Sequence, residues 1–444
     1  MTNRSATLRI VAADWVVPVV TPAIRNGLVV IEGGRIVWLG RAEHLPSQWA
    51  SAQVDHLAGV LMPGLVNAHT HLQYTHFDEV GRGSYTSFED WSEAFNDVYE
   101  AVVDPHDWWL AALDGARQAV ESGTTVFAEI VTNDEARGAL SACDVHGIEY
   151  LEAIGHFDRR WRSGARDEFI ARLEQPSAVT VGISPHAPYS LDGSVIMDLL
   201  DIAAERNMRV HSHVAESSRE AALYGHGDGA VLSVSGDLRD EFDLVRRGGS
   251  GFTTAAYADS LGLLNPRTHL AHAIYLGREE RDLLLRRGTQ VALCPRSNAV
   301  IGLDAPPVAA YLDEGHEIAV GTDSLASSPS LDLMADVRLL AELAIEQGYD
   351  NADLYMRLIR AATTGGAKAL GLAEGSGYGA LAPGGPADLA LFAIEVHDEG
   401  VEHALVMTGA GNCVMTISAG RTIFDAREDA LARRPLEPNL EARS

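Results

Sequence analysis

The sequence predicts an α/β protein in which eight parallel β/α units close into a TIM-like (β/α)8 barrel. A small β-sandwich domain built from both chain ends is predicted to accompany it. Three observations lead to this fold class. Eight short apolar segments alternate with helix-like sequence in the middle of the chain. Both ends carry β-branched stretches separated by turns, and metal-binding side chain types stand where several of the apolar segments end.

The two chain ends have the texture of strands and hairpins. The segments concerned are residues 7–17, 27–40, 56–62, 387–395 and 404–424. A Gly- and Pro-rich stretch from Gly375 to Pro386 separates the C-terminal group from the middle of the chain. We therefore predict a composite β domain over residues 6–62 and 378–430, and a barrel domain over residues 63–377.

The middle of the chain contains eight candidate strands, the number that closes a (β/α)8 barrel. They are residues 65–71, 124–130, 148–155, 179–186, 209–216, 268–273, 289–295 and 317–323. Before the second of these, Trp109, Leu113, Ala116 and Val120 recur at helical spacing on one face. Such a face is expected of a helix in the outer layer of a barrel.

Composition narrows the classes of partner. The 444 residues are ample for two domains, and 46% apolar with 22% charged residues is ordinary for a globular protein. A formal net charge of -28 argues against nucleic acid, because phosphate backbones are bound mainly by clustered Lys and Arg. The expected partner is a small-molecule substrate, and a homodimer is plausible because symmetric dimers are the commonest assemblies.

Cysteine usage and hydropathy bear on the compartment. The three cysteines, Cys143, Cys294 and Cys413, are odd in number and far apart, so they predict neither a disulfide framework nor a zinc knuckle. No apolar run has the length of a membrane span, and Asp14 and Pro18 interrupt the best candidate for a leader. We expect a cytoplasmic protein that does not bind a membrane.

Four segments end in groups that bind divalent metals, five residues in all. His69 and His71 form an H-x-H in a predicted strand, where residues i and i+2 project from the same face and can reach one ion. An H-x-H alone is weak evidence, since two half-buried polar side chains explain it equally well. However, His213, His272 and Asp323 also close predicted strands. In a (β/α)8 barrel the chemistry lies at these carboxyl ends, so the pattern predicts one hydrolytic metal centre.

These motifs, PG-x-V-N-x-H-T-H, P-H-A-P, H-x-x-E, A-H and G-T-D, resemble those of the amidohydrolase superfamily over nearly the whole chain. Within it, the chain is similar to the mononuclear deaminase and chlorohydrolase branch. The resemblance implies that His69, His71, His213 and Asp323 bind the metal. It further implies that Glu216 and His272 assist catalysis, as does Asp323 by accepting a proton, and that His186 touches the substrate.

The ligand types suit Zn²⁺, with Fe²⁺ as an alternative. Zinc lowers the pKa of bound water from about 15.7 to about 7, so hydroxide could attack the carbon that bears an exocyclic amine and release ammonia. Glu216 follows His213 by three residues and can shuttle a proton over the same cavity, whereas the alternative is a surface carboxylate. The H-x-x-E pattern selects His213 over His211, which we expect to be a hydrogen-bonded interior residue.

One ion is favoured over two. Two-metal members of the superfamily commonly carry a carboxylated lysine after the fourth strand, and the only lysine here is Lys368, beyond the eighth. Glu129 and Glu152 stay open as substitutes for it. Around the expected mouth, Gln73, Ser297 and Asn298 are candidates for substrate contact, although Gln73 is equally well explained as a polar loop residue. The long stretch 225–251 is either a lid or a tolerated insertion.

The substrate is suggested only by short strings. HTHLQYTHF, SFEDW, PHAPYS, LCPRSNAVIG and GTDSLASSPSLDL look most similar to the aminodeoxyfutalosine deaminases of menaquinone biosynthesis. This resemblance implies deamination of 6-amino-6-deoxyfutalosine, an aminopurine nucleoside. The alternatives are a deaminase of methylthioadenosine, S-adenosylhomocysteine, adenosine or another heterocycle, a triazine-type chlorohydrolase or cyclic-amide hydrolase, and a metal-free scaffold. The complete set of metal-binding groups argues against the scaffold.

Overall fold

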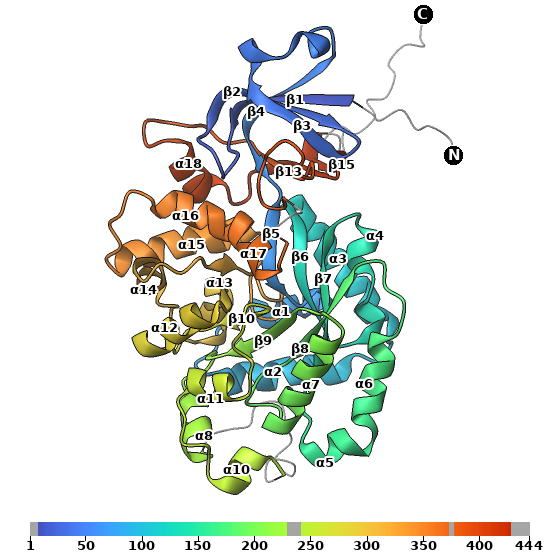
Figure 1. Ribbon diagram of the computed structural model, residues 1–444, viewed down its shortest axis with the longest axis vertical. Coiled ribbons are helices and arrows are strands. Elements are labelled where there is room, and N and C mark those ends of the chain that lie inside the picture. The colour runs from blue at the N-terminus through green and yellow to red at the C-terminus, as the bar shows by residue number, and fades with distance from the viewer. Residues whose placement is uncertain (1–7, 229–240, 373–376, 428–444) are drawn as a thin grey trace, which may run out of the picture.

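The structure, a computed structural model, describes residues 8–228, 241–372 and 377–427. Its strands pair in two sheets, one of eight strands and one of seven. The seven-stranded sheet lies at one end of the molecule, and the eight-stranded sheet and its helices form the rest (Figure 1). Of the predicted domain limits, residues 6 and 7 and residues 428–430 lie outside the described residues, and the limits themselves stay predictions.

The eight-stranded sheet is the predicted barrel. Its order is β12-β11-β10-β9-β8-β7-β6-β5, and every recorded pairing is parallel. Each of the eight predicted segments supplies one strand. The strands are β5 (Leu65–Thr70), β6 (Thr124–Val131), β7 (His146–Ala153), β8 (Thr180–Pro185), β9 (Val210–Val214), β10 (Thr268–His272), β11 (Gln290–Leu293) and β12 (Ala319–Val320).

Closure of the barrel brings the first and last strands together. A parallel bridge joins Thr70 to Asp323, and the Asp323 backbone N–H donates to the carbonyl of His69 at 3.0 Å. Gly321 allows this approach, because a Cβ at that position would lie 2.6 Å from the Cβ of His69. The close contact therefore places Asp323 beside the H-x-H segment.

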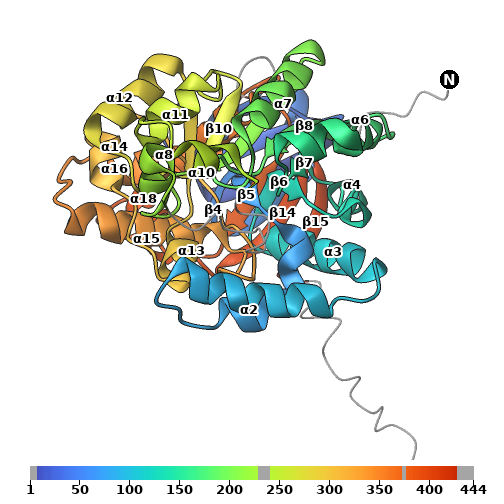
Figure 2. The same ribbon diagram turned by 90° about the horizontal axis from the view of Figure 1, so that it is seen from below.

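Helices follow the strands and surround them, as the view along the barrel shows (Figure 2). The longer ones are α2 (Phe88–Ala101), α3 (His106–Glu121), α6 (Arg166–Leu173), α7 (Gly193–Glu205), α12 (Arg278–Arg287) and α15 (Leu333–Glu346). The shorter ones include α4 (Ala139–Ala142), α5 (Asp158–Arg160), α8 (Glu220–His226), α10 (Asp243–Arg247), α11 (Thr254–Ser260), α13 (Pro295–Ile301), α14 (Val308–Asp313), α16 (Leu354–Arg360) and α17 (Gly366–Ala369). Between strands and helices, the buried Val, Ile and Leu of the strands form the main core.

Helix α3 is the helix predicted before the second strand. Ala116 and Val120 are buried as expected, while Trp109 and Leu113 are only half-buried. The buried stripe also includes Trp108, Ala112 and Ala119, so it is wider than the predicted face and rotated relative to it. The residues are packing residues, as the sequence indicated.

The seven-stranded sheet is mixed and combines both chain ends, as predicted. Its order is β15-β14-β13-β4-β1-β2-β3, hydrogen-bonded as one continuous sheet. The strands are β1 (Leu8–Val16), β2 (Ile24–Glu32), β3 (Arg35–Arg41), β4 (Val54–Pro63), β13 (Leu389–Phe392), β14 (Cys413–Ser418) and β15 (Arg421–Asp425).

One part of the C-terminal prediction was wrong. The first five residues of the segment 404–424 have strand-like composition, yet they lie in helix α18 (Val401–Thr408), whereas the remainder supplies β14 and β15 as expected. Val401, Ala404 and Leu405 are buried there at i, i+3 and i+4. This helical spacing, rather than the β-branched content, decides the local structure.

The small sheet covers the amino ends of the barrel strands. Gly64, just before β5, donates its backbone N–H to the carbonyl of Asp388 at 2.9 Å. Ser418 in β14 donates to the carbonyl of Asp144, two residues before β7, at 2.7 Å. Because the barrel strands are parallel, their carboxyl ends point away from this sheet, and α2, α7, α8 and α10 lie around that far end (Figure 1).

Among the residues described, no helix has the length and apolar character needed to cross a membrane. The cytoplasmic location and the homodimer stay predictions. Of the stretch 225–251, residues 229–240 lie outside the described residues, and the flanking parts contain α8 and α10.

Candidate metal centre and active site

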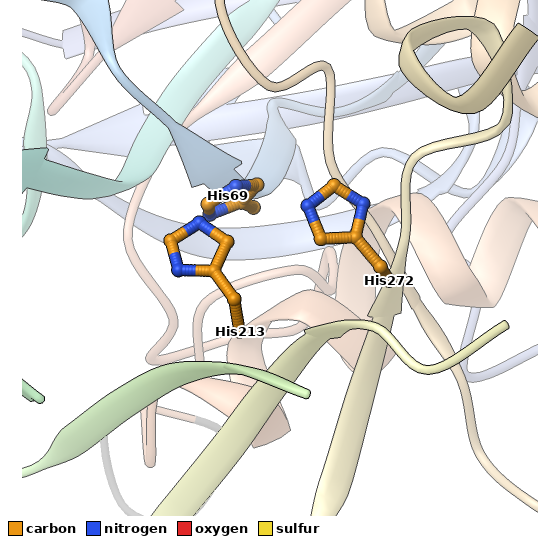
Figure 3. Close-up of side chains that lie close together, drawn as sticks. All are labelled: His69, His213 and His272. Atoms are coloured by element: carbon orange, nitrogen blue, oxygen red, sulfur yellow. The ribbon is translucent and has the colours of Figure 1, made fainter. Parts of the chain in front are cut away.

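Imidazoles from three strands meet at the carboxyl end of the barrel. His69 is in β5, His213 in β9 and His272 ends β10, and Figure 3 shows the three rings gathered in one space. Their ligand atoms lie within 4.8 Å of one another. His71 follows β5, and its Nε2 lies 3.3 Å from Nε2 of His213. The alternation of side chains along β5 therefore brings both imidazoles of the H-x-H to one point.

Asp323 completes this group from the last strand. Its Oδ1 lies 3.5 Å from Nε2 of His69 and 3.8 Å from Nε2 of His71, and its Oδ2 lies 4.0 Å from Nε2 of His272. The carboxylate is 7% exposed. Residues that are far apart in sequence thus place three histidine nitrogens around one carboxylate.

The chemistry of this donor set fits a divalent cation. Both ring nitrogens of His69, Nδ1 of His71 and Nε2 of His272 are buried without a hydrogen-bond partner among the described residues. Burial lowers the pKa of His69 and, more strongly, those of His71 and His213, so the imidazoles are neutral. Burial alone would raise the pKa of Asp323, but the nearby imidazoles, first of all that of His69 at 3.5 Å, bring it well below its ordinary value. Neutral imidazoles and an ionised carboxylate are the forms that bind Zn²⁺ or Fe²⁺.

Neighbouring groups orient these side chains. His213 donates from Nδ1 to the backbone carbonyl of His186 at 2.8 Å, which leaves Nε2 free for an ion. His272 donates from Nδ1 to Oδ1 of Asn298 at 3.1 Å, which frees its Nε2 in the same way. The hydroxyls of Ser297 and Ser327 both donate to Oδ2 of Asp323, at 2.7 and 3.0 Å.

The backbone is strained where the strands end at the site. Ala215, His272 and Asp323 have φ values of 56°, 69° and 59°, in the left-handed region that residues with a Cβ rarely adopt. Glu220 stabilises the first of these turns, since its carboxylate accepts from the backbone N–H groups of Ala215, Glu216 and Ser217. The unusual backbone turns side chains at strand ends toward one centre.

Glu216 lies beside the donor set. Its Oε1 is 3.4 Å from Nε2 of His272, and its Oε2 accepts a hydrogen bond from the hydroxyl of Tyr189 at 2.7 Å. Burial raises the pKa of Glu216 to about 8, although the Tyr189 hydroxyl lowers it. A carboxyl group with this pKa holds a proton at neutral pH and can donate it to a bound molecule.

A cavity opens over this group. It is lined by side chains from the strand ends and from helix α2, namely His71, Tyr74, Phe88, Trp91, Ser92, Phe95, Asn96, Glu152, Ile154, His186, Tyr189, His213, Glu216, Asp323 and Ser324. His186, which we expected to touch a substrate, is among them. A hydrogen bond of 2.8 Å joins its Nδ1 to Oγ of Ser190. Tyr189, Phe88 and Trp91 were not singled out from the sequence, although they fall within the quoted strings PHAPYS and SFEDW, and Phe95 lies four residues beyond the second string.

The other three expected substrate contacts lie elsewhere. Gln73 is fully buried and does not line the cavity. Its Oε1 accepts from the backbone N–H of Asn133 at 3.1 Å, so the side chain holds a neighbouring segment of the protein rather than facing the cavity. Ser297 and Asn298 belong to α13 and are also fully buried. They contact Asp323 and His272 rather than the cavity, because the first turn of α13 directs them at the strand ends.

The deeper histidines differ from the expectation in one respect. His211 is fully buried but has no hydrogen-bond partner among the described residues. It stacks instead on His69, with ring centroids 4.7 Å apart and planes 12° from parallel. His269 lies beside it, with centroids 4.5 Å apart, and contacts the carbonyl of Ala68.

The groups considered for a second ion are placed as follows. Lys368 is exposed on α17 and pairs with Glu317, far from the cavity. Glu129 accepts from Thr70 Oγ1 and from the backbone of Leu72, outside the cavity lining. Glu152 does line the cavity, with a ligand atom within 4.8 Å of those of His186 and His213. However, the free Nε2 of His213 already faces His71 at 3.3 Å, which favours one ion.

Comparison with known proteins identifies the family of the chain. The model of the amidohydrolase family matches residues 60–423. A 5-methylthioadenosine/S-adenosylhomocysteine deaminase of Nitratidesulfovibrio vulgaris (strain DP4) is 30% identical over 378 residues, covering 82% of this chain and 78% of that protein.

Two solved structures show the same fold. The aminofutalosine deaminase of Helicobacter pylori with methylthio-coformycin has a TM-score of 0.77 at 19% identity, covering 93% of this chain and 99% of that one. The atrazine chlorohydrolase of Arthrobacter aurescens complexed with zinc has a TM-score of 0.75 at 19% identity, covering 97% of each chain. The chain therefore belongs to the amidohydrolase family, in its deaminase and chlorohydrolase branch, and is a hydrolase of carbon–nitrogen bonds.

Proposed function

We propose that the protein is a metal-dependent hydrolytic deaminase of a 6-aminopurine nucleoside that releases ammonia. The observation that carries the proposal is the buried Glu216, whose Oε1 lies 3.4 Å from Nε2 of His272 at the edge of a group of imidazoles and one carboxylate. A hydrolytic deaminase needs both a water nucleophile and a proton for the ring nitrogen. This arrangement offers a place for each of them at the end of one cavity.

His69, His71, His213 and Asp323 would hold the ion, for which Zn²⁺ is the first choice. When bound, such an ion lowers the pKa of water and so makes hydroxide available near pH 7. Asp323 can accept a proton from that water, because two hydroxyl donors and the neighbouring imidazoles keep it ionised.

Glu216 is proposed to protonate the ring nitrogen next to the carbon that is attacked. Its hydrogen bond to Tyr189 directs one carboxyl oxygen away, which leaves Oε1 toward His272 and the cavity. His272 is proposed to hydrogen-bond the attacking oxygen through Nε2, the nitrogen that Asn298 leaves free. General acid and base assistance of this kind contributes about 10² to 10⁴ in rate.

The substrate is proposed at the level of its class. The sequence strings favour 6-amino-6-deoxyfutalosine, whereas the curated relative that is 30% identical is named for methylthioadenosine and S-adenosylhomocysteine. All are adenosine derivatives altered at the 5′ position. The rings of Tyr189, which is hydrogen-bonded to Glu216, and of His186 in the cavity lining suit a purine ring.

An ammonia-release assay on the zinc-loaded protein tests the proposal. Adenosine, methylthioadenosine, S-adenosylhomocysteine and 6-amino-6-deoxyfutalosine form the panel, with a chlorotriazine as the competing substrate class. We expect ammonia from at least one nucleoside and its loss in Glu216→Gln. Chloride release from the triazine with no ammonia from any nucleoside would replace this proposal with a chlorohydrolase.

A further inference from the structure

One wall of the cavity is aromatic and is formed mainly by one helix. Phe88, Trp91 and Phe95 stand on α2 at successive positions of one face. Their rings are in contact, with centroids 5.2 Å apart for Phe88 and Trp91 and 5.4 Å apart for Trp91 and Phe95. Tyr74 packs edge-on against Phe95 at 5.0 Å. The wall is therefore a continuous apolar surface rather than a set of isolated rings.

This wall is held in place before any ligand binds. Ser87 caps α2 by accepting from the backbone N–H of Asp90 at 3.1 Å. The indole of Trp91 donates to the carbonyl of Ala326 at 2.9 Å. Because its only polar hydrogen is used in this bond, Trp91 presents an apolar face to the cavity.

Among the described residues that line the cavity, Glu152 is the remaining carboxyl side chain besides Glu216 and Asp323. It is 4% exposed, and its Oε2 accepts from Thr132 Oγ1 at 2.7 Å. Its Oε1 is buried without a hydrogen-bond partner among the described residues. Glu152 is either negative or neutral, so it supplies no positive charge. Its Oε1 can accept a hydrogen bond from a substrate.

Among the described residues that line the cavity, none is Lys or Arg. The nearest arginine to Glu152, Arg172, lies outside the lining, where it donates to the backbone carbonyl of Glu152 and pairs with Asp134, both at 2.9 Å. Within the part of the lining that the structure describes, a carboxylate on the distal part of a substrate would therefore meet no Lys or Arg side chain to replace its lost water.

We infer that the cavity selects aminopurine nucleosides whose 5′ substituent is uncharged and apolar, and disfavours those that carry a carboxylate there. The inference rests on the proposed function and deepens it. The reacting end of the purine must lie at the metal-binding group, so the 5′ substituent lies toward α2 and Ile154. Of the candidates above, methylthioadenosine has such a substituent, while 6-amino-6-deoxyfutalosine carries a benzoate and S-adenosylhomocysteine an amino acid.

The test uses two substrates whose 5′ carbon chains have the same length, on the zinc-loaded protein. These are 5′-propylthio-5′-deoxyadenosine and 5′-(2-carboxyethyl)thio-5′-deoxyadenosine, which differ in the end group of the chain, a methyl in the first and a carboxylate in the second. We expect kcat/KM to be higher for the propylthio compound by about tenfold or more, the scale of one uncompensated charge at an effective dielectric constant of about 20. Equal or greater kcat/KM for the carboxylate compound would overturn the inference.

Variants locate the cause of the selectivity. Ser92→Lys places a cation on the cavity side of α2, and we expect it to reduce the preference by about tenfold through a lower KM for the carboxylate compound. Glu93→Gln changes the charge of the same helix by the same amount outside the cavity lining, and should leave the preference unchanged. Glu152→Gln should narrow the preference as well. If Ser92→Lys and Glu93→Gln shift the ratio equally, the effect is a general one of protein charge, and the cavity is not its source.

The outcome is separable from failure of the proposed function. If neither compound, nor adenosine, yields ammonia with the zinc-loaded protein, the proposed function fails before selectivity is measured. If both compounds yield ammonia at the same kcat/KM, the protein is a deaminase and only the inference about its cavity is wrong.

Discussion

Two layers of histidines lie one above the other in the barrel and differ in the side chains that they contact. The upper layer, at the carboxyl ends of the strands, has Asp323 and Glu216 within 4.0 Å of its ring nitrogens. The lower layer, His211 and His269, contacts His69 and the ring of Tyr150 instead. Across the residues that the structure covers, neither lower histidine forms an ion pair.

The difference shows that an imidazole in a barrel becomes a candidate ligand through its height along the strand. His211 and His213 are two residues apart on the same face of β9, yet only His213 reaches the level at which carboxylates converge. Burial lowers the pKa of both side chains, so both are neutral. Neutrality is needed for binding a cation, but a nearby carboxylate is what compensates its charge.

Removal of the ion is expected to have the largest effect. Dialysis of the zinc-loaded protein against a chelator should abolish ammonia release, and added Zn²⁺ should restore it, because the water nucleophile depends on the ion. Elemental analysis should find about one ion per chain. Full activity in the chelated protein would remove the metal from the mechanism, and two ions per chain would indicate that the lower layer or Glu152 also binds.

Alanine substitutions in the two histidine layers are expected to have the next largest effect. His213→Ala should lose both the ion and more than about 100-fold in activity, since a direct ligand matters at least as much as the groups that orient it. His211→Ala, two residues away on the same face, is the matched control and should retain the ion while lowering Tm. The reverse result, with the ion lost only in His211→Ala, would show that the lower layer is the binding layer.

Glu216→Gln is expected to keep the ion and to lower kcat by about 10² to 10⁴, the usual contribution of a general acid or base. Glu149→Gln is a suitable control, because Glu149 is buried but its carboxylate accepts from the backbone of Gly138, outside the cavity lining. The control should affect stability rather than kcat. A near-normal rate in Glu216→Gln with the ion still bound would take Glu216 out of the reaction.

Ser297→Ala and Asn298→Ala are expected to give the smallest change, about 10- to 100-fold in kcat or metal affinity. These residues hold Asp323 and His272, so KM should be little affected once the ion is bound. Steady-state kinetics with saturating Zn²⁺ distinguishes this role from substrate contact. A raised KM at constant kcat would instead support the direct contact predicted from the sequence.

Much of the fold could be predicted because its signals are local. Each of the eight barrel strands was found from a short apolar segment, and the strand ends placed the metal-binding residue types at one level. The prediction was wrong where composition and periodicity disagreed, as in α18, whose Val401, Ala404 and Leu405 follow helical spacing. Ser297 and Asn298 were expected around the mouth, just after the seventh strand, but they lie in the first turn of helix α13 and face inward.

By itself, the sequence determined the number of β/α units, the composite second sheet and the residues that can bind a metal. It could do so because strand periodicity and strand ends are properties of a few consecutive residues. Only the tertiary structure decided that Asp323 meets His69 through closure of the barrel, that Ser297 and Asn298 face that group, and that α2 forms the cavity wall. Contacts between segments far apart in the chain depend on how the whole barrel packs, and no single segment carries that information.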